Sequence, residues 1–241
     1  MARIQKDYWF NEQMRVDKYI CKSTELNRDE ASVMLQSRRV SIDGKVFTNG
    51  AVQVHDNNVV TLEGEVLTLR PFRYLLMHKP ANTLCSNIDE SYPSIFNYID
   101  VSKKSELHVV GRLDADTTGL VLITDDGSWT YKIITPKAEC EKVYRVQLRN
   151  DISEGAIQQL EQGLNLQGLD EATLPAKVQV LGAREVFLTI TQGKFHQVKR
   201  MFRAVGNRVR SLHREQIGQV TLDVDEGKWR YLTQEEVSTF Y

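Results

Sequence analysis

A series of short strand-like runs after residue 73 limits most strongly what this chain can fold into. The runs are rich in Val, Ile, Leu, Tyr and Phe, and their lengths suit β-strands rather than helices. Hairpin-like spacings between them, as at VLGAREVF, favour a mixed or mainly antiparallel sheet over alternating βαβ units. The runs are RYLLMHKP, LHVVGRL, LVLIT, KVYRVQL, AKVQVL, EVFLTIT and VRSLHREQI. The pattern therefore predicts an α+β domain built on a sheet.

Helical patterns are fewer and lie between these runs, so we expect helices that flank the sheet. The candidates are DGSWTYKII, ISEGAIQQLEQG and HQVKRMFRAVG. Near the end of the chain, Thr233 and Glu236 have the spacing of a capping box, which predicts a short final helix.

The first part of the chain predicts a separate small module. RVDKYICKST and RDEASVMLQSR read as two helices, and Asn27 is a candidate N-cap with Glu30 three residues later. Asp43-Gly44 between β-prone residues then signals a hairpin. We predict four parts: an N-terminal extension over 1–13, a small domain over 14–63, a linker over 64–73 and a larger domain over 74–241.

Composition excludes several classes of protein. The 241 residues are 41% hydrophobic and 26% charged, as in ordinary globular proteins. No run approaches the roughly 18 apolar residues of a membrane span, and the N-terminus lacks the apolar core of a signal peptide, so we expect a cytoplasmic protein. Cys21, Cys85 and Cys140 have neither disulfide-framework nor zinc-ligand spacing. No nucleotide-binding or metalloprotease motif is present, so we expect no cofactor and no metal.

The segment GRLDADTTGL, residues 111–120, places charges between two apolar strand-like runs. Burying Arg112 and Asp114 without partners would cost several kcal/mol, so each needs a partner or a cleft. One reading is a charged turn. Another is a glycosidase pair formed by Asp114 and Asp116.

A basic stretch follows later in the chain. From Lys194 to Arg214 there are seven Lys or Arg residues and no Asp or Glu. Such a strip suits the phosphate backbone of a nucleic acid, although a solvated charged face is the alternative. We predict RNA contacts from both domains, at Arg15, Lys18, Arg28, Arg38 and Arg39 in the first, and at Lys142, Lys194, Arg200, Arg203, Arg208 and Arg210 in the second.

Two further residues are ambiguous when taken alone. Tyr144 lies in EKVYRV, where a strand tyrosine usually belongs to the core or to a cross-strand pair. His196 has no nearby nucleophile or metal-ligand spacing, so it is weak evidence for acid–base catalysis.

Taken in order, these segments resemble the pseudouridine synthases that modify ribosomal RNA. GRLDADTTGL is similar to that family's catalytic loop, and RYLLMHKP, LVLITDDG, CEKVYRV, GKFHQVKRMF and LHREQIG follow the family's order. The first module resembles an S4 RNA-binding domain in RVDKYI, NRDEASVML and SRRVSIDGKV. There, Ser37-Arg38-Arg39 replaces the more usual glycine-containing turn. The resemblance runs from Met14 to about Phe240.

The resemblance implies roles for particular residues. The family's catalytic aspartate falls on Asp114 and not on Asp116, and its active-site tyrosine falls on Tyr144. The basic partner of the aspartate falls on Lys199, where many relatives have arginine. We therefore expect Lys199 to help keep the Asp114 carboxylate ionised.

The resemblance also implies a substrate-base pocket and a reaction. Leu212 matches an apolar residue beside the target base, and Arg112 matches an arginine near the space that a flipped nucleotide vacates. The expected reaction is isomerisation of a uridine to pseudouridine, without a cofactor. Asp114 would act either as a nucleophile or as a base that removes a ribose proton, and the sequence does not distinguish the two.

The expected substrate is 16S rRNA, bound by a monomer within a small-subunit assembly intermediate. The similarity from HQVKRMF to LHREQIG favours this branch, because large-subunit relatives usually carry arginine pairs where this chain has Lys199-Arg200. The alternatives are a 23S rRNA pseudouridine synthase of the same fold, a non-catalytic S4 protein of ribosome assembly, and a glycosidase or base-excising enzyme.

Overall fold

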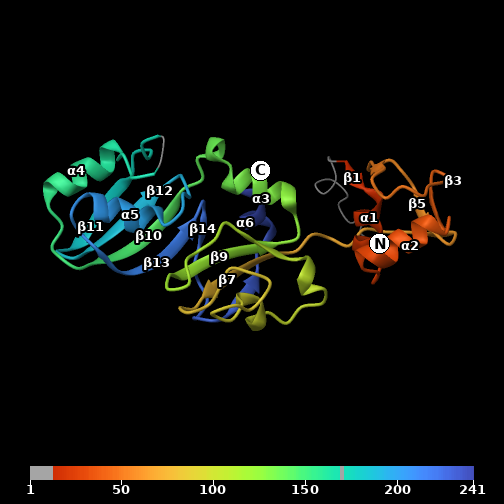
Figure 1. Cartoon of the computed structure of the whole chain (residues 1–241), viewed down its shortest axis with the longest axis horizontal. Helices are drawn as coiled ribbons and strands as arrows, with labels where there is room; N and C mark the ends of the chain where they lie inside the picture. The colour runs from red at the N-terminus through yellow and green to blue at the C-terminus, as the bar shows by residue number, and fades with distance from the viewer. Residues whose placement is uncertain (1–12, 169–170) are drawn as a thin grey trace. The chain divides into compact units, whose positions relative to one another are not determined.

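The computed structural model describes residues 13–168 and 171–241, and the chain divides between Phe72 and Arg73 into two compact units (Figure 1). The expected extension over 1–13 lies, apart from Gln13, outside the described residues. Each unit has its own cluster of buried apolar side chains.

The first unit contains two helices and short strands, as predicted. Strands β3, β2, β5 and β6 form one antiparallel sheet, and β1 pairs with β4. The two helices are α1 (Val16–Ser23) and α2 (Arg28–Gln36). The strands are β1 (Met14–Arg15), β2 (Val40–Ile42), β3 (Lys45–Val46), β4 (Gln53–Val54), β5 (Val60–Leu62) and β6 (Glu65–Val66).

Two local sequence signals account for much of this unit. Asn27 caps α2: its side-chain oxygen accepts from the backbone N–H groups of Asp29 and Glu30, and the Glu30 carboxylate accepts from Asn27 N–H at 2.7 Å. Such a capping box satisfies helix donors that otherwise lack partners. At the β2–β3 hairpin, Asp43 and Gly44 both have positive φ, 50° and 76°, which suits a tight two-residue turn.

The predicted linker over 64–73 is wrong for most of its length, because residues 64–72 fold with the first unit. Strand β6 pairs with β5. The Arg70 guanidinium donates to the carbonyl oxygens of Lys22 at 2.7 Å and Cys21 at 2.8 Å, near the C-terminal end of α1. Carbonyl groups in the last turn of a helix have no partner within the helix, so Arg70 supplies the missing donors.

The second unit is a mixed, mainly antiparallel sheet with flanking helices, as predicted. The strand order is β11-β12-β10-β13-β9-β7-β15, with β14 on β13 and β8 on β9, and among the pairs of these described strands only β9–β13 is parallel. The strands are β7 (Tyr74–Lys79), β8 (His108–Val110), β9 (Thr118–Thr124), β10 (Lys142–Leu148), β11 (Lys177–Gly182), β12 (Glu185–Ile190), β13 (Val209–Ile217), β14 (Val220–Thr221) and β15 (Trp229–Tyr231).

Helices cover this sheet at both ends (Figure 1). α4 contacts β11, and α5 contacts β13. At the other end, Trp129 of α3 is fully buried, lies edge-on to Tyr74 at 4.9 Å and donates to the Val237 carbonyl of α6 at 3.2 Å. Burying a large apolar side chain contributes roughly 2–3 kcal/mol, so these contacts anchor the helices. The helices are α3 (Gly127–Ile134), α4 (Glu154–Gln162), α5 (Gln197–Ala204), α6 (Gln234–Ser238) and the short 3-10 turns η1 (Ile95–Tyr98), η2 (Lys104–Glu106) and η3 (Pro136–Ala138).

A glycine allows the parallel pairing at the centre of the sheet. Gly119 of β9 lies opposite Arg214 of β13 and has φ +109°. A Cβ at Gly119 would lie 2.3 Å from the Arg214 carbonyl oxygen, so only glycine lets the two backbones approach this closely. This register brings the loop before β9 next to β13.

No described helix is long and apolar enough to cross a membrane. Cys85 and Cys140 are free thiols, and the described residues contain no cluster of His, Cys, Asp and Glu suited to a metal ion.

Candidate active site

A cavity of about 270 Å³ lies beside the β9–β13 pairing. Its walls come from the loop between β8 and β9, the end of α3, strands β10 and β13, and the segment from the end of β12 into α5. All five residues predicted for catalysis and for the base pocket line it: Arg112, Asp114, Tyr144, Lys199 and Leu212. The structure thus brings together residues that are as many as 100 positions apart in the sequence.

A buried lysine holds the loop that carries Asp114. Lys79, at the end of β7, is fully buried, and its ammonium donates to the carbonyl oxygens of Pro80 at 3.0 Å, Ala115 at 3.1 Å and Thr117 at 2.9 Å. Burial lowers the pKa of Lys79. Removing this lysine would deprive the Thr117 carbonyl of its donor, whereas the carbonyl groups of Pro80 and Ala115 also accept from Thr83 Oγ1 and Asn82 N–H. The sequence analysis did not identify Lys79, although a lysine that ends an apolar strand was a visible signal.

Lys199 bridges the two aspartates of the loop. Its Nζ lies 2.8 Å from Asp114 Oδ2 and 2.6 Å from Asp116 Oδ1. Burial acts to lower the pKa of Lys199, but the hydrogen bonds and negative charges of the two carboxylates outweigh it and raise that pKa. Partial burial likewise acts to raise the pKa of Asp116, yet Lys199 leaves it lowered. The ion-paired state is therefore the stable one at neutral pH.

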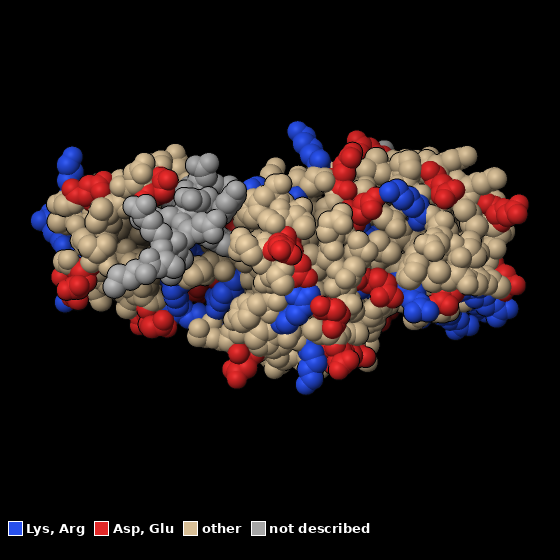
Figure 2. All heavy atoms as spheres, turned by 180° about the vertical axis from the view of Figure 1, so that it is seen from behind, with Lys and Arg blue, Asp and Glu red and all other residues tan. Residues whose placement is uncertain are grey.

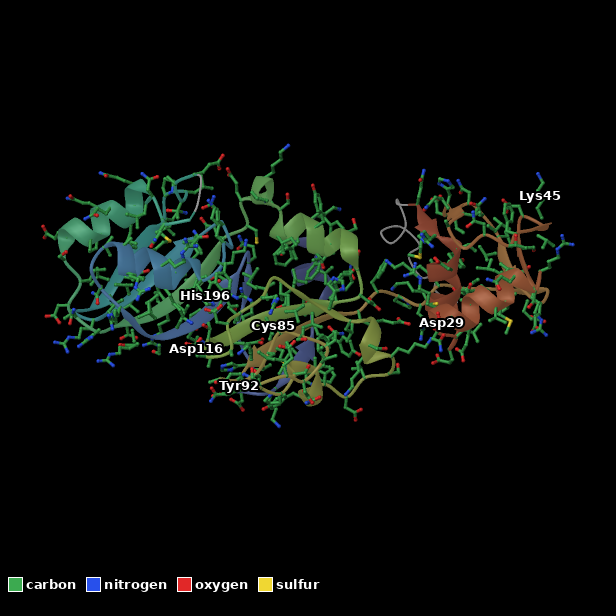
Figure 3. The ribbon with its side chains drawn as sticks, viewed as in Figure 1. Asp29, Lys45, Cys85, Tyr92, Asp116 and His196 are labelled. Carbon is green, nitrogen blue, oxygen red and sulfur yellow. The ribbon has the colours of Figure 1, made fainter. Side chains whose placement is uncertain are left out.

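His196 also approaches the carboxylate of Asp114. Its Nε2 lies 3.3 Å from Asp114 Oδ1, and in Figure 3 it lies in the same part of the unit as Asp116. His196 has a left-handed backbone with φ 47°, and α5 begins directly after it at Gln197. The Phe195 ring is exposed and stacks on the imidazole at a centroid distance of 3.7 Å. From the sequence, His196 was only weak evidence for acid–base catalysis, because its closeness to Asp114 arises from the fold and not from the spacing along the chain.

Tyr144 and Leu212 form part of the wall on adjacent strands. Both are more than nine-tenths buried, and both line the cavity. The Tyr144 hydroxyl lies 3.4 Å from Nη1 of Arg214, another cavity residue that the sequence analysis did not identify. A flat aromatic ring and an apolar side chain suit a planar base.

Lys142 is not the exposed RNA contact that we predicted. It is buried, and its ammonium donates to the carbonyl oxygens of Cys140 at 2.6 Å and Thr191 at 3.3 Å. Burial lowers the pKa of Lys142. The alternation of β10 explains the error, because Lys142 and Tyr144 lie on the same, inward face of the strand.

Most of the other predicted RNA contacts in this unit lie in or beside a second hollow of about 350 Å³. Its lining residues are Asp116, His196, Lys199, Arg200, Arg203, Arg208 and Val209. Lys194 lines the first cavity, and Arg210 is exposed on β13. We call this second hollow the basic hollow. Acidic and basic side chains are interspersed over much of the face in Figure 2, so the basic hollow is a local concentration of positive charge in a chain whose net charge is −1.

In the first unit, the five predicted contacts are exposed but differ in their partners. Arg15 and Arg28 lie 2.6 and 3.5 Å from the carboxylate of Asp17. Arg39 pairs with Glu63, whereas Lys18 and Arg38 form no ion pair among the described residues. Lys18 and Arg38 are therefore the cations available to an added phosphate.

Comparison with known proteins gives concordant results over the chain. The family model described as RNA pseudouridylate synthase matches residues 73–204. A Vibrio cholerae protein named ribosomal small subunit pseudouridine synthase A is 45% identical over 230 residues, which cover 95% of this chain and 100% of that protein. An Escherichia coli K12 protein of the same name is 40% identical over 94% of this chain and 99% of its own length. A crystal structure described as pseudouridylate synthase superposes with TM-score 0.70 and 41% identity, covering 95% of this chain and 100% of that one.

Proposed function

This chain belongs to the RNA pseudouridylate synthase family, and we propose that it isomerises a specific uridine of 16S rRNA to pseudouridine, with Asp114 as the catalytic carboxylate and no cofactor. The names of the relatives support the small-subunit substrate. The observation that carries the chemistry is the cavity in which Asp114, Lys199 and Tyr144 meet.

The proposed reaction needs no external reagent. The C1′–N1 bond breaks, and its electron pair stays on the uracil. C1′ of the sugar is then short of electrons. The Asp114 carboxylate compensates for this either by bonding to C1′ or by taking a proton from C2′. The uracil turns and C5 bonds to C1′, while the bond between Asp114 and C1′ breaks or, on the other route, the proton returns to C2′. The hydrogen on C5 then leaves as a proton, and N1 gains a proton. The product is an isomer of the substrate.

The remaining cavity residues have supporting roles in this proposal. Lys199 orients the Asp114 carboxylate and balances its charge through the 2.8 Å contact. Tyr144 stacks on the base and limits water in the cavity, and Leu212 packs beside it. Arg112 occupies the space that the target nucleotide leaves when it flips.

The basic hollow would bind the RNA backbone around the flipped nucleotide. Taking a base out of its stack costs a few kcal/mol. Phosphate contacts from Arg200, Arg203 and Arg208 can offset that cost by releasing counterions. We propose that the enzyme acts as a monomer on a small-subunit assembly intermediate, and therefore in the cytoplasm.

The small unit is proposed to dock RNA, and Lys18 and Arg38, which form no ion pair among the described residues, provide a test. We expect Lys18→Ala combined with Arg38→Ala to weaken binding to 16S rRNA and to reduce the slope of log affinity against log salt by about 1–2. The single-turnover rate at saturating RNA should not change. Lys45→Ala, which removes an exposed lysine of the same unit, is the matched control (Figure 3). Unchanged affinity in the double variant would contradict the docking role.

Nucleoside mapping in cells tests the proposed substrate. We expect 16S rRNA from cells lacking this protein to lose a pseudouridine that the wild-type gene restores and the Asp114→Asn gene does not. The 23S rRNA should be unaffected. A pseudouridine lost from 23S instead would favour the large-subunit alternative. Restoration by both genes would indicate a role that does not depend on Asp114.

A further inference from the structure

Arg214 is a buried cation in the cavity wall, and it has no acidic partner among the described residues. Arg214 is only 3% exposed to solvent. Nε donates to the Leu120 carbonyl at 2.7 Å and Nη1 to the Tyr144 hydroxyl at 3.4 Å. Nη2 is buried without a hydrogen-bond partner among those residues. A guanidinium stays protonated, and burying one without a counter-charge costs several kcal/mol.

The cavity as a whole has the same imbalance. Among its described lining residues there is one carboxylate, Asp114, which Lys199 already pairs. Among the described residues, the ammonium of Lys142 donates to carbonyl oxygens and to no carboxylate. The cationic lining residues are Arg112, Lys142, Lys194, Lys199 and Arg214. The region around Tyr144 therefore has positive charge that the protein does not neutralise, which suits a ligand that is or becomes negative.

We propose, resting on the proposed function, that Arg214 is a catalytic residue that donates a hydrogen bond to a carbonyl oxygen of the target uracil and stabilises the negative charge of the detached base. When the C1′–N1 bond breaks, the electron pair left on N1 is delocalised over the ring carbonyl oxygens. Arg214 holds that charge until C5 bonds to C1′, the C5 proton leaves and N1 is protonated. A backbone phosphate is a poorer partner, because Arg214 is almost wholly buried beside Tyr144.

The fold positions Arg214 before the substrate arrives. Its backbone lies against Gly119 of β9, where a Cβ would collide with it. Its Nε donates to the carbonyl oxygen of Leu120, the next residue of β9. A donor that is already in place costs no reorganisation when charge develops in the transition state. The glycine and the leucine that end GRLDADTTGL thus orient this guanidinium.

Replacing the charge tests the assignment. We expect Arg214→Gln, which keeps a planar donor but loses the charge, to lower the single-turnover rate at saturating 16S rRNA by about 30-fold, as for one charge-assisted hydrogen bond. RNA affinity should change little. Arg214→Lys, which keeps the charge, should retain more activity. Arg145→Gln makes the same change on β10 at an exposed position beside Tyr144, and it should leave the rate unchanged.

A second substrate separates catalysis from a structural defect. RNA with 5-fluorouridine at the target position has a base that holds negative charge better. The loss caused by Arg214→Gln, measured as disappearance of the N-linked nucleoside after digestion and chromatography, should therefore shrink to a few-fold on this RNA. Equal losses on both RNAs would overturn the proposal. If Arg214→Gln does not fold, the same comparison with Arg214→Lys decides by the same criterion. Failure of the wild-type protein to modify 16S rRNA would instead overturn the proposed function.

Discussion

Asp114→Asn is expected to lower the rate of pseudouridine formation on the order of 10⁴-fold, the scale on which loss of a catalytic nucleophile or base acts. Asparagine has nearly the same shape, but it neither bonds readily to C1′ nor accepts a proton from C2′. RNA affinity and thermal stability should stay close to wild type, because the side chain still fits the cavity. Single-turnover assays with nucleoside analysis, together with filter binding, measure the two quantities separately.

Asp116→Asn is the matched control in the same loop. The Asp116 side chain is 69% exposed, against 26% for Asp114, and it shares the Lys199 ammonium. An exposed ion pair contributes about 0–1 kcal/mol, so the rate should fall by at most a few-fold. An inactive Asp116→Asn protein with an active Asp114→Asn protein would reverse the assignment of the two carboxylates.

The sequence predicted best those features that depend on neighbouring residues. The capping boxes at Asn27 and Thr233 and the hairpin at Asp43-Gly44 are all present, because each depends on side chains within a few positions of the backbone groups that they satisfy. The mixed sheet followed from strand lengths and hairpin spacings. The five cavity residues followed from the family resemblance, since spacing alone left a charged turn and a glycosidase open.

Contacts between distant segments explain most of what was missed. The Lys79 ammonium donates to carbonyl groups 36 and 38 positions away, and Arg214 donates to one that is 94 positions away. Arg70 fixes the supposed linker through carbonyl groups 48 and 49 positions away. Backbone carbonyl groups leave no trace in the side-chain pattern. A buried lysine or arginine with carbonyl partners therefore reads as an ordinary surface charge in the sequence.

Lys199→Met is expected to lower the single-turnover rate about 100-fold while RNA affinity falls only slightly. The variant removes two charge-assisted hydrogen bonds, at 2.8 Å to Asp114 and 2.6 Å to Asp116, and loss of about 3 kcal/mol of orientation and charge balance corresponds to that factor. One phosphate contact fewer changes affinity little when several basic residues remain. Because the pKa of Lys199 is raised, its ammonium is fully charged below the ordinary value of about 10.5 and loses its proton only as pH rises through the higher folded value.

Three further variants identify the reason for the loss. Lys199→Arg keeps the cation and should retain appreciable activity, although its geometry differs. Without Lys199 the two carboxylates repel each other and the pKa of Asp116 should rise, so adding Asp116→Asn to Lys199→Met should recover part of the rate. Arg203→Ala, in the basic hollow, should weaken RNA binding without changing the saturated rate. A Lys199→Met protein with weakened binding and a normal saturated rate would show that Lys199 contacts phosphate and does not support Asp114.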